Sequence, residues 1–167
     1  MRMLAFLFVL GTLQAAPPEV VDRVDLARYM GTWHVIAKFP NRFQRGCGCT
    51  TATYALRPDS KVSVLNRCRT AGGKVKSATG WAKVVDSTSN AKLKVTFFWP
   101  FFGDYWILAL DPDNWDVLVG TPERKYLWIL ARQPRLEPER LQALRAKATE
   151  QGFEVARLVT TEPCEQP

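Results

Sequence analysis

The chain has 167 residues, of which 47% are hydrophobic, and carries a formal net charge of +7. This length allows one well-packed domain and is short for two. The basic residues are scattered along the chain, which argues against nucleic acid as the partner. An anionic membrane surface or an acidic ligand headgroup suits this charge better, although solubility alone also accounts for it.

The first residues have the pattern of a secretory signal peptide. Arg2 is followed by the apolar run Leu4–Leu10 and by the small pair Ala15–Ala16. The run is shorter than the roughly 20 apolar residues of a membrane-spanning helix. We therefore predict a signal peptide over residues 1–16 and one domain over residues 17–167. No cysteine follows the run to accept a lipid anchor, so we expect an exported protein, periplasmic or secreted, with unanchored outer-membrane association left open.

Export places the four cysteines in an oxidising compartment, where an even number predicts disulfide bonds. Cys47 and Cys49 are separated by one residue, a spacing that suits neither a redox motif nor a zinc site. Each is therefore expected to pair elsewhere. Cys68 and Cys164 are the remaining partners, and the residues alone do not choose between the two crossings.

The first predicted strand follows a short helical turn expected between Val24 and Met30. Apolar residues alternate along this strand and predict two faces. The buried face comprises Trp33, Val35, Ala37 and Phe39, and the opposite face comprises His34, Ile36 and Lys38.

Further strands are expected at short intervals, separated by turns rich in proline, glycine and aspartate. They lie at residues 50–56, 61–69, 75–85, 93–99, 105–110, 115–119 and 125–132. A meander of about eight strands is typical of an antiparallel up-and-down barrel. Helical spacing appears only between Pro138 and Gly152, at Leu141, Leu144 and Ala148, and predicts one helix packed outside the barrel. Residues 153–160 return to strand character.

An aromatic cluster lies between Phe97 and Trp106, on either side of Pro100. A soluble protein rarely exposes so many aromatic rings. The cluster is therefore expected either to plug the core or to line the rim of a cavity that receives an apolar guest.

The sequence offers little that would support catalysis. His34 is the only histidine and is expected to point away from the face of Trp33, which disfavours acid–base catalysis and transition-metal binding. The acidic segment from Asp111 to Asp116 superficially resembles a calcium loop, but the glycine and final glutamate of that motif are out of register. We expect a structural turn there, and predict no catalytic residue, no metal, no cofactor and no enzymatic activity.

Three segments, in order, resemble the motifs of the lipocalin family. They are Gly31-Thr32-Trp33, Tyr105-Trp106-Ile107-Leu108 with the turn before Trp115, and residues 126–132. The resemblance covers about residues 24–164 and is strongest for the bacterial lipocalin and apolipoprotein D-like group. It implies an all-β fold, an eight-stranded antiparallel up-and-down barrel with one C-terminal helix outside. It also implies that Arg132 packs on Trp33 at the closed end, with Gly31, Trp33 and Arg132 as structural residues.

The resemblance also bears on the disulfide bonds. Cys49 stands five positions before Tyr54, an arrangement similar to that of apolipoprotein D, where the matching cysteine joins the tail. This implies the pair Cys49–Cys164. The pair Cys47–Cys68 is similar to one found in many bacterial members.

By the same resemblance, the barrel is expected to bind and carry a small hydrophobic ligand, a fatty acid or lysophospholipid, in envelope lipid storage or transport. The positions that match cavity-lining residues are Tyr54, Asn66, Phe97, Tyr105 and Trp128, and strand alternation adds Trp99 to the face of Phe97. The basic residues Arg67, Arg69, Lys74 and Lys76 are candidates for contact with an anionic headgroup.

Two alternatives remain open. A packed barrel would make the chain a protein-interaction module, and a free, cavity-facing cysteine would favour a lipocalin-type enzyme that acts on its ligand. The sequence does not choose between monomer and homodimer. It also leaves open whether the aromatic turn is a lid, a dimer contact or a site of transient membrane contact.

Overall fold

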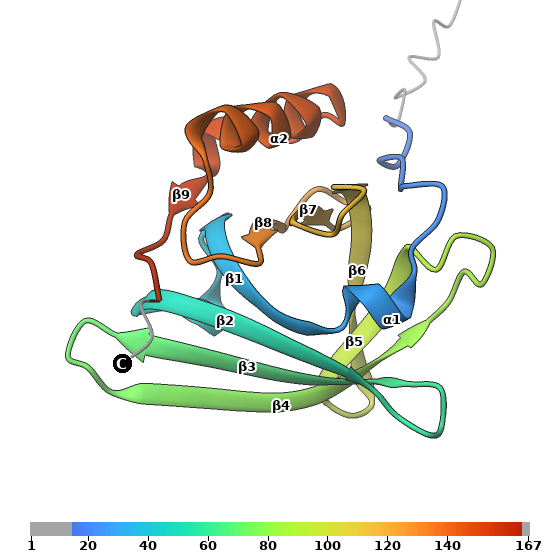
Figure 1. Ribbon diagram of the computed structural model, residues 1–167, viewed down its shortest axis with the longest axis horizontal. Helices are drawn as coiled ribbons and strands as arrows, with labels where there is room; N and C mark the ends of the chain where they lie inside the picture. The colour runs from blue at the N-terminus through green and yellow to red at the C-terminus, as the bar shows by residue number, and fades with distance from the viewer. Residues whose placement is uncertain (1–14, 165–167) are drawn as a thin grey trace, which may run out of the picture.

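The strands close into one barrel in the computed structural model, which describes residues 15–164 (Figure 1). The predicted signal peptide lies outside these residues except for Ala15 and Ala16. The strands are β1 (Gly31–Lys38), β2 (Cys47–Leu56), β3 (Val62–Thr70), β4 (Val75–Val84), β5 (Lys92–Phe98), β6 (Phe101–Leu110), β7 (Asp116–Gly120), β8 (Leu127–Ala131) and β9 (Val159–Thr160). From β1 to β8 consecutive strands pair antiparallel, and the pairing of β1 with both β8 and β2 closes the barrel.

Two α-helices accompany the barrel. Helix α1 (Leu26–Tyr29) is capped at its N-terminus by Asp25, whose side chain accepts a hydrogen bond from the Arg28 N–H. Helix α2 (Pro138–Glu150) lies outside the barrel, on the side of β7 and β8 (Figure 1). Short 3-10 turns span Arg42–Gln44 and Val155–Arg157. Within residues 15–164, none of the helices has the length and apolar content needed to span a bilayer.

The predicted eight-stranded barrel with an outer C-terminal helix is confirmed. Strands β2 and β6 begin several residues earlier than predicted. The predicted strand over residues 153–160 is wrong for most of its length, because the N–H groups of Val155, Arg157 and Leu158 bond to nearby carbonyls in a 3-10 turn. Only Val159–Thr160 pairs with β1, as β9.

The barrel wall separates two apolar clusters. The inner cluster fills the barrel toward its closed end and includes Trp33, Val35, Leu93, Ile107 and Val119. The outer cluster lies between the wall and helix α2, and includes Phe39, Leu118, Ile129, Leu144 and Ala148. Burial of both faces explains why β7 and β8 read as almost continuous apolar runs.

A bulge near the end of β1 changes which side chains face the barrel interior. Val35 pairs with Leu130 of β8, but the next pair joins Ala37 to Ile129. Ile36 is therefore the extra residue of the bulge, and it packs in the outer cluster beside Ala37.

Beyond the bulge, the alternation of the strand is shifted by one residue. Ala37 and Phe39 belong to the outer cluster, whereas Lys38 lies opposite Trp128, which packs against the inner cluster. The predicted faces of the first strand are therefore wrong for Ala37, Phe39 and Lys38. A strict period of two cannot survive an inserted residue.

Two disulfide bonds tie β2 to its surroundings. Cys47 is bonded to Cys68 on β3, and Cys49 is bonded to Cys164 in the C-terminal tail. The tail is also held by backbone hydrogen bonds from Thr161 N–H to Ile36 and from Glu162 N–H to Gly48. These bonds use all four cysteines of the chain.

Candidate functional site: the barrel interior

Trp33 and Arg132 seal one end of the barrel. Trp33 is fully buried, and its indole N–H donates to the Tyr29 carbonyl at 2.9 Å. The Arg132 guanidinium carbon lies 3.8 Å from the centre of the indole ring, so the two planar groups are in close contact. The guanidinium also donates to the backbone carbonyls of Asn114, Thr32 and Arg28 at 2.8–3.2 Å. Arg132 thereby joins three separate segments at the closed end.

Gly31 is required at this closed end for two reasons. Its φ of +95° lies in a region that L side chains rarely adopt. A Cβ atom at this position would also lie 3.3 Å from a guanidinium nitrogen of Arg132, which is closer than ordinary contact. The Gly-Thr-Trp sequence thus admits both the turn from α1 into β1 and the arginine.

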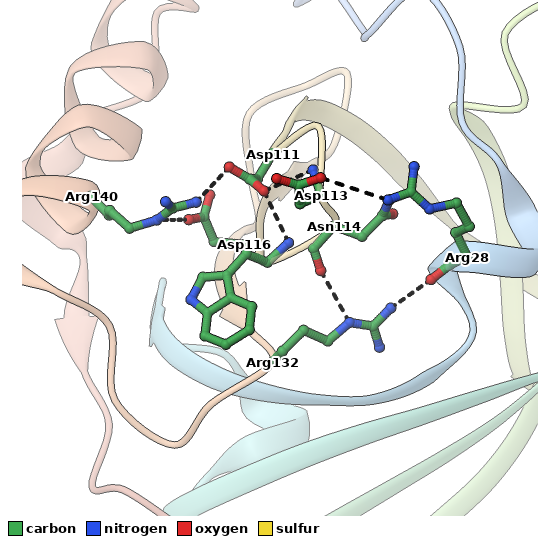
Figure 2. Close-up of polar contacts among 8 residues, drawn as sticks. Arg28, Asp111, Asp113, Asn114, Asp116, Arg132 and Arg140 are labelled. Atoms are coloured by element: carbon green, nitrogen blue, oxygen red, sulfur yellow. Dashed lines mark hydrogen bonds and ion pairs between the residues drawn. The ribbon is translucent and has the colours of Figure 1, made fainter.

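The loop between β6 and β7 connects the closed end to helix α2 (Figure 2). The Asp111 carboxylate accepts from the backbone N–H groups of Asp113 and Trp115, and both Asp111 and Asp116 bind Arg140 of α2 at 2.5 Å. Burial raises the pKa of Asp111, but these hydrogen bonds outweigh it and hold the pKa below its usual value. The acidic segment is therefore a turn whose carboxylates have partners from the chain.

Three tyrosines form a polar cluster above this floor. The Tyr105 hydroxyl lies 2.7 Å from the hydroxyl of Tyr29 and 3.1 Å from that of Tyr54. Burial raises the pKa of all three phenols well above the usual value, so they are neutral hydrogen-bonding groups. Tyr54 and Tyr105 were predicted cavity residues, whereas Tyr29 was missed because it precedes the barrel strands.

The middle of the barrel is lined by the predicted residues Asn66 and Phe97. Asn66 is half-buried and lies between Ala52 of β2 and Ala78 of β4. Phe97 occupies space beside Gly80, where an added Cβ atom would come within 2.8 Å of the phenyl ring. The same Cβ atom would come still closer to the backbone carbonyl of Thr96, so Gly80 makes room both for the neighbouring strand and for the phenyl ring.

The opposite end of the barrel is open to solvent. In β4, residues 76–79 are exposed on both faces, including Lys76 and Ala78, which occupy inward positions opposite Cys68 and Asn66. Gly103, an inward neighbour of Val95, is also exposed. Inward side chains are thus buried near the floor and accessible near the mouth.

One wall of the mouth is aromatic and held by a polar anchor. The predicted residue Trp128 is half-buried, stacks on Tyr126 with a centroid distance of 5.7 Å, and donates its indole N–H to Gln44 at 3.2 Å. The Phe43 ring lies 6.2 Å from that of Tyr126. Sequence reasoning missed Phe43 and Gln44 because they lie in a loop with no strand alternation to reveal their direction.

Trp99 is not placed as the alternation predicted, and the four basic candidates take different positions around the β3–β4 hairpin. Strand β5 ends at Phe98, and Trp99 lies in the following turn with 76% of its surface exposed, so it does not share the inner face of Phe97. Arg67 and Arg69 alternate with the inward Asn66 and Cys68 and are exposed on the outer face. Lys74 lies in the turn before β4, and of these four bases Lys76 alone has an inward register position.

The described residues offer few groups for covalent chemistry. Both cysteine pairs are disulfide-bonded, so the free thiol on which the lipocalin-type enzyme alternative depends is absent. Between residues 15 and 164, no three His, Cys, Asp or Glu side chains gather as metal ligands. His34 lies on the outer face opposite Ala131, and burial lowers its pKa.

A closed barrel with a sealed floor and an accessible mouth has the shape of a cup. A family model described as "Lipocalin-like domain" matches residues 24–163, and the chain therefore belongs to the lipocalin family. It is 43% identical to the outer membrane lipoprotein Blc of Citrobacter freundii, over 93% of this chain and 89% of that protein. It is 32% identical to bovine (Bos taurus) apolipoprotein D, over 90% of this chain and 82% of that protein.

Solved structures show the same fold. Insecticyanin from Manduca sexta matches with a TM-score of 0.71 at 21% identity, over 91% of this chain and 86% of that chain. Lobster apocrustacyanin A1 matches with a TM-score of 0.69 at 14% identity, over 90% and 91%. The barrel is therefore shared with proteins whose sequences differ at most positions.

Proposed function

We propose that this protein binds and carries a single-chain lipid, a fatty acid or a lysophospholipid, inside its barrel. The observation that carries the proposal is the gradient of accessibility along the inner face. Trp33 closes the floor, while inward positions near the mouth, such as Asn66 and Ala78, remain accessible. Aliphatic and aromatic walls suit an acyl chain, which gains about 0.8 kcal/mol for each buried methylene group.

A binding role without chemical conversion suits the same site. The phenols of Tyr29, Tyr54 and Tyr105 are neutral and hydrogen-bonded to one another. No free thiol is present among the described residues. The relatives named as outer membrane lipoproteins support an exported location, as do the two disulfide bonds. A periplasmic or secreted carrier in envelope lipid transport fits both the relatives and the disulfide bonds.

Native mass spectrometry of the protein purified from its own host, before and after organic extraction, tests the proposal. We expect a released mass that matches a fatty acid or a lysophospholipid. Added oleate should then displace a bound fluorescent fatty acid from the extracted protein. A protein that is empty when isolated and refuses added oleate would instead favour the protein-interaction alternative.

Two matched variants locate the binding site. Ala78→Trp places an indole on the inner face at the mouth, and Thr79→Trp places one on the outer face of the same strand. We expect the first to weaken oleate binding about tenfold or more and the second to change it by less than about twofold. Equal effects of the two variants would argue against a ligand in the barrel.

The same end of the barrel is suited to transient contact with a membrane. Phe98, Trp99 and Phe101 form an aromatic tip at the turn between β5 and β6, and each is 76–79% exposed. Basic residues, including Arg42, Arg45 and Lys76, are exposed at the same end. Aromatic rings beside cations match the interface of an anionic bilayer, where a carrier would collect or release lipid.

Sedimentation with vesicles that contain anionic phospholipid tests the aromatic tip. The triple variant Phe98→Ser/Trp99→Ser/Phe101→Ser should bind these vesicles about tenfold less well. Leu56→Ser/Val85→Ser removes exposed apolar side chains at the closed end and should bind as the unmodified protein does. Unchanged vesicle binding by the triple variant, together with a shift from dimer to monomer, would identify the tip as a dimer contact instead.

A further inference from the structure

Lys38 is an unusual residue for the inner face of an apolar barrel. Only 7% of its surface is exposed, and its ammonium group has no hydrogen-bond partner among the described residues. The bulge at Ile36 turns it inward, opposite Trp128. Burial lowers the pKa of Lys38, which means that the surroundings disfavour the charged form. An unpaired buried ammonium is unfavourable for folding, so its presence calls for a compensating partner.

Lys38 also lines a hollow at the mouth of the barrel. The hollow has a volume of about 380 Å³ and is open to solvent. Its lining includes Asn41, Arg42, Gln44 and Arg45, all from the loop that follows β1. Three of the lining side chains are cationic, namely Lys38, Arg42 and Arg45. Within residues 15–164, no ion pair joins any of the three to a carboxylate.

The hollow adjoins the aromatic wall of the barrel through Gln44. The Gln44 carbonyl oxygen accepts from the indole N–H of Trp128 and from the Asn41 amide at 2.8 Å. Because Trp128 is opposite Lys38 in the sheet, a molecule in contact with the Trp128 ring lies next to the lysine. An apolar wall and an uncompensated cation thus meet at one place.

We propose that Lys38 is the headgroup site of the carrier: its ammonium group pairs with the anionic headgroup of a single-chain lipid whose tail lies along Trp128 into the barrel. The proposal rests on the lipid-carrier function above and adds the charge of the ligand. A carboxylate and a phosphate monoester share the required chemistry, a compact anion at the end of an acyl chain. Arg42 and Arg45, exposed at the rim of the hollow, favour approach of either anion.

Lys38→Met tests the proposal, because it removes the charge and keeps a flexible apolar side chain of similar length. Binding of three probes by the delipidated protein is measured: oleate, oleoyl lysophosphatidic acid, and the neutral oleyl alcohol. We expect Lys38→Met to weaken binding of at least one anionic probe about tenfold or more and to change oleyl alcohol binding by less than about twofold. Which anion loses affinity identifies the headgroup as carboxylate or phosphate.

Two further variants and one further measurement complete the test. Lys38→Arg keeps a positive charge and should retain most of the affinity for the anion. Lys83→Met removes an exposed lysine from the outer face of β4 and should change nothing. The Tm of ligand-free Lys38→Met should rise, because the unpaired charge is gone. A merely structural lysine would not combine a higher Tm with weaker anion binding.

The outcomes separate this inference from the carrier function. If the unmodified protein binds none of the three probes, the carrier function itself is overturned. If it binds them and Lys38→Met weakens none of the three, or weakens oleyl alcohol as much as the anionic probes, the carrier function stands and the role of Lys38 is overturned. If the loss is confined to an anionic probe, the headgroup site is established.

Discussion

Replacing Trp33 with alanine should lower the free energy of unfolding by about 3–5 kcal/mol, the usual range for a buried tryptophan. The indole is fully buried, and its loss leaves a large cavity at the closed end. It also removes the surface on which Arg132 rests and the donor to the Tyr29 carbonyl. Because the floor joins β1, α1 and the loop between β6 and β7, we expect the whole barrel to unfold more readily.

Urea unfolding followed by circular dichroism measures the effect of Trp33→Ala. Trp99→Ala is the matched control, since 76% of Trp99 is exposed and its loss should change stability by less than about 0.5 kcal/mol. A loss below about 1 kcal/mol for Trp33→Ala would show that the floor is not a main source of stability.

The second large effect is expected from the disulfide between Cys49 and Cys164, which joins residues 115 apart in the sequence. In the chain-entropy model, its removal by the double change Cys49→Ala/Cys164→Ala costs about 4.8 kcal/mol. The bond between Cys47 and Cys68 spans only 21 residues, and the same model gives about 3.3 kcal/mol for its removal. The difference arises because a longer loop restricts the unfolded chain more.

Equilibrium unfolding of the two double variants, compared under non-reducing conditions, provides the measurement. Cys49→Ala/Cys164→Ala, which lacks the disulfide that closes the long loop, should be the less stable of the two variants. Greater destabilisation by Cys47→Ala/Cys68→Ala would mean that contacts in the folded state, rather than entropy of the unfolded chain, govern the effect of these bonds.

Most strands could be predicted from the sequence because local alternation and turn residues suffice to place them. Strands β3, β4 and β5 each begin and end within one residue of the predicted bounds. The contact of Arg132 with Trp33 has no local signal, because the two residues are 99 positions apart, and the family motifs point to it most directly. The tail after α2 was predicted less well, because its apolar residues pack beneath the helix instead of forming a sheet edge.

The direction of individual side chains was harder to predict than the strands themselves. A single inserted residue at Ile36 reverses the faces that follow it, which hid Lys38 from the candidate site. The end of β5 at Phe98 similarly removed Trp99 from the inner face. The bulge has no local signal such as a glycine or a proline within the strand, and it depends on pairing with residues distant in sequence. The end of β5 does have one, because Pro100 follows Trp99 and marks the turn into β6.

The depths at which tryptophans lie in this barrel provide the protein with its own optical probes. Trp33 is enclosed at the floor, Trp128 is half-buried at the mouth, and Trp99 is in water at the aromatic tip. Indole emission shifts to shorter wavelength as its surroundings become less polar. Lipid uptake should therefore alter the fluorescence of Trp128, docking on vesicles should shift that of Trp99 to the blue, and Trp33 should serve as the constant internal reference. Loading and docking can thus be followed separately, without an added label, in variants that keep Trp33 together with either Trp128 or Trp99.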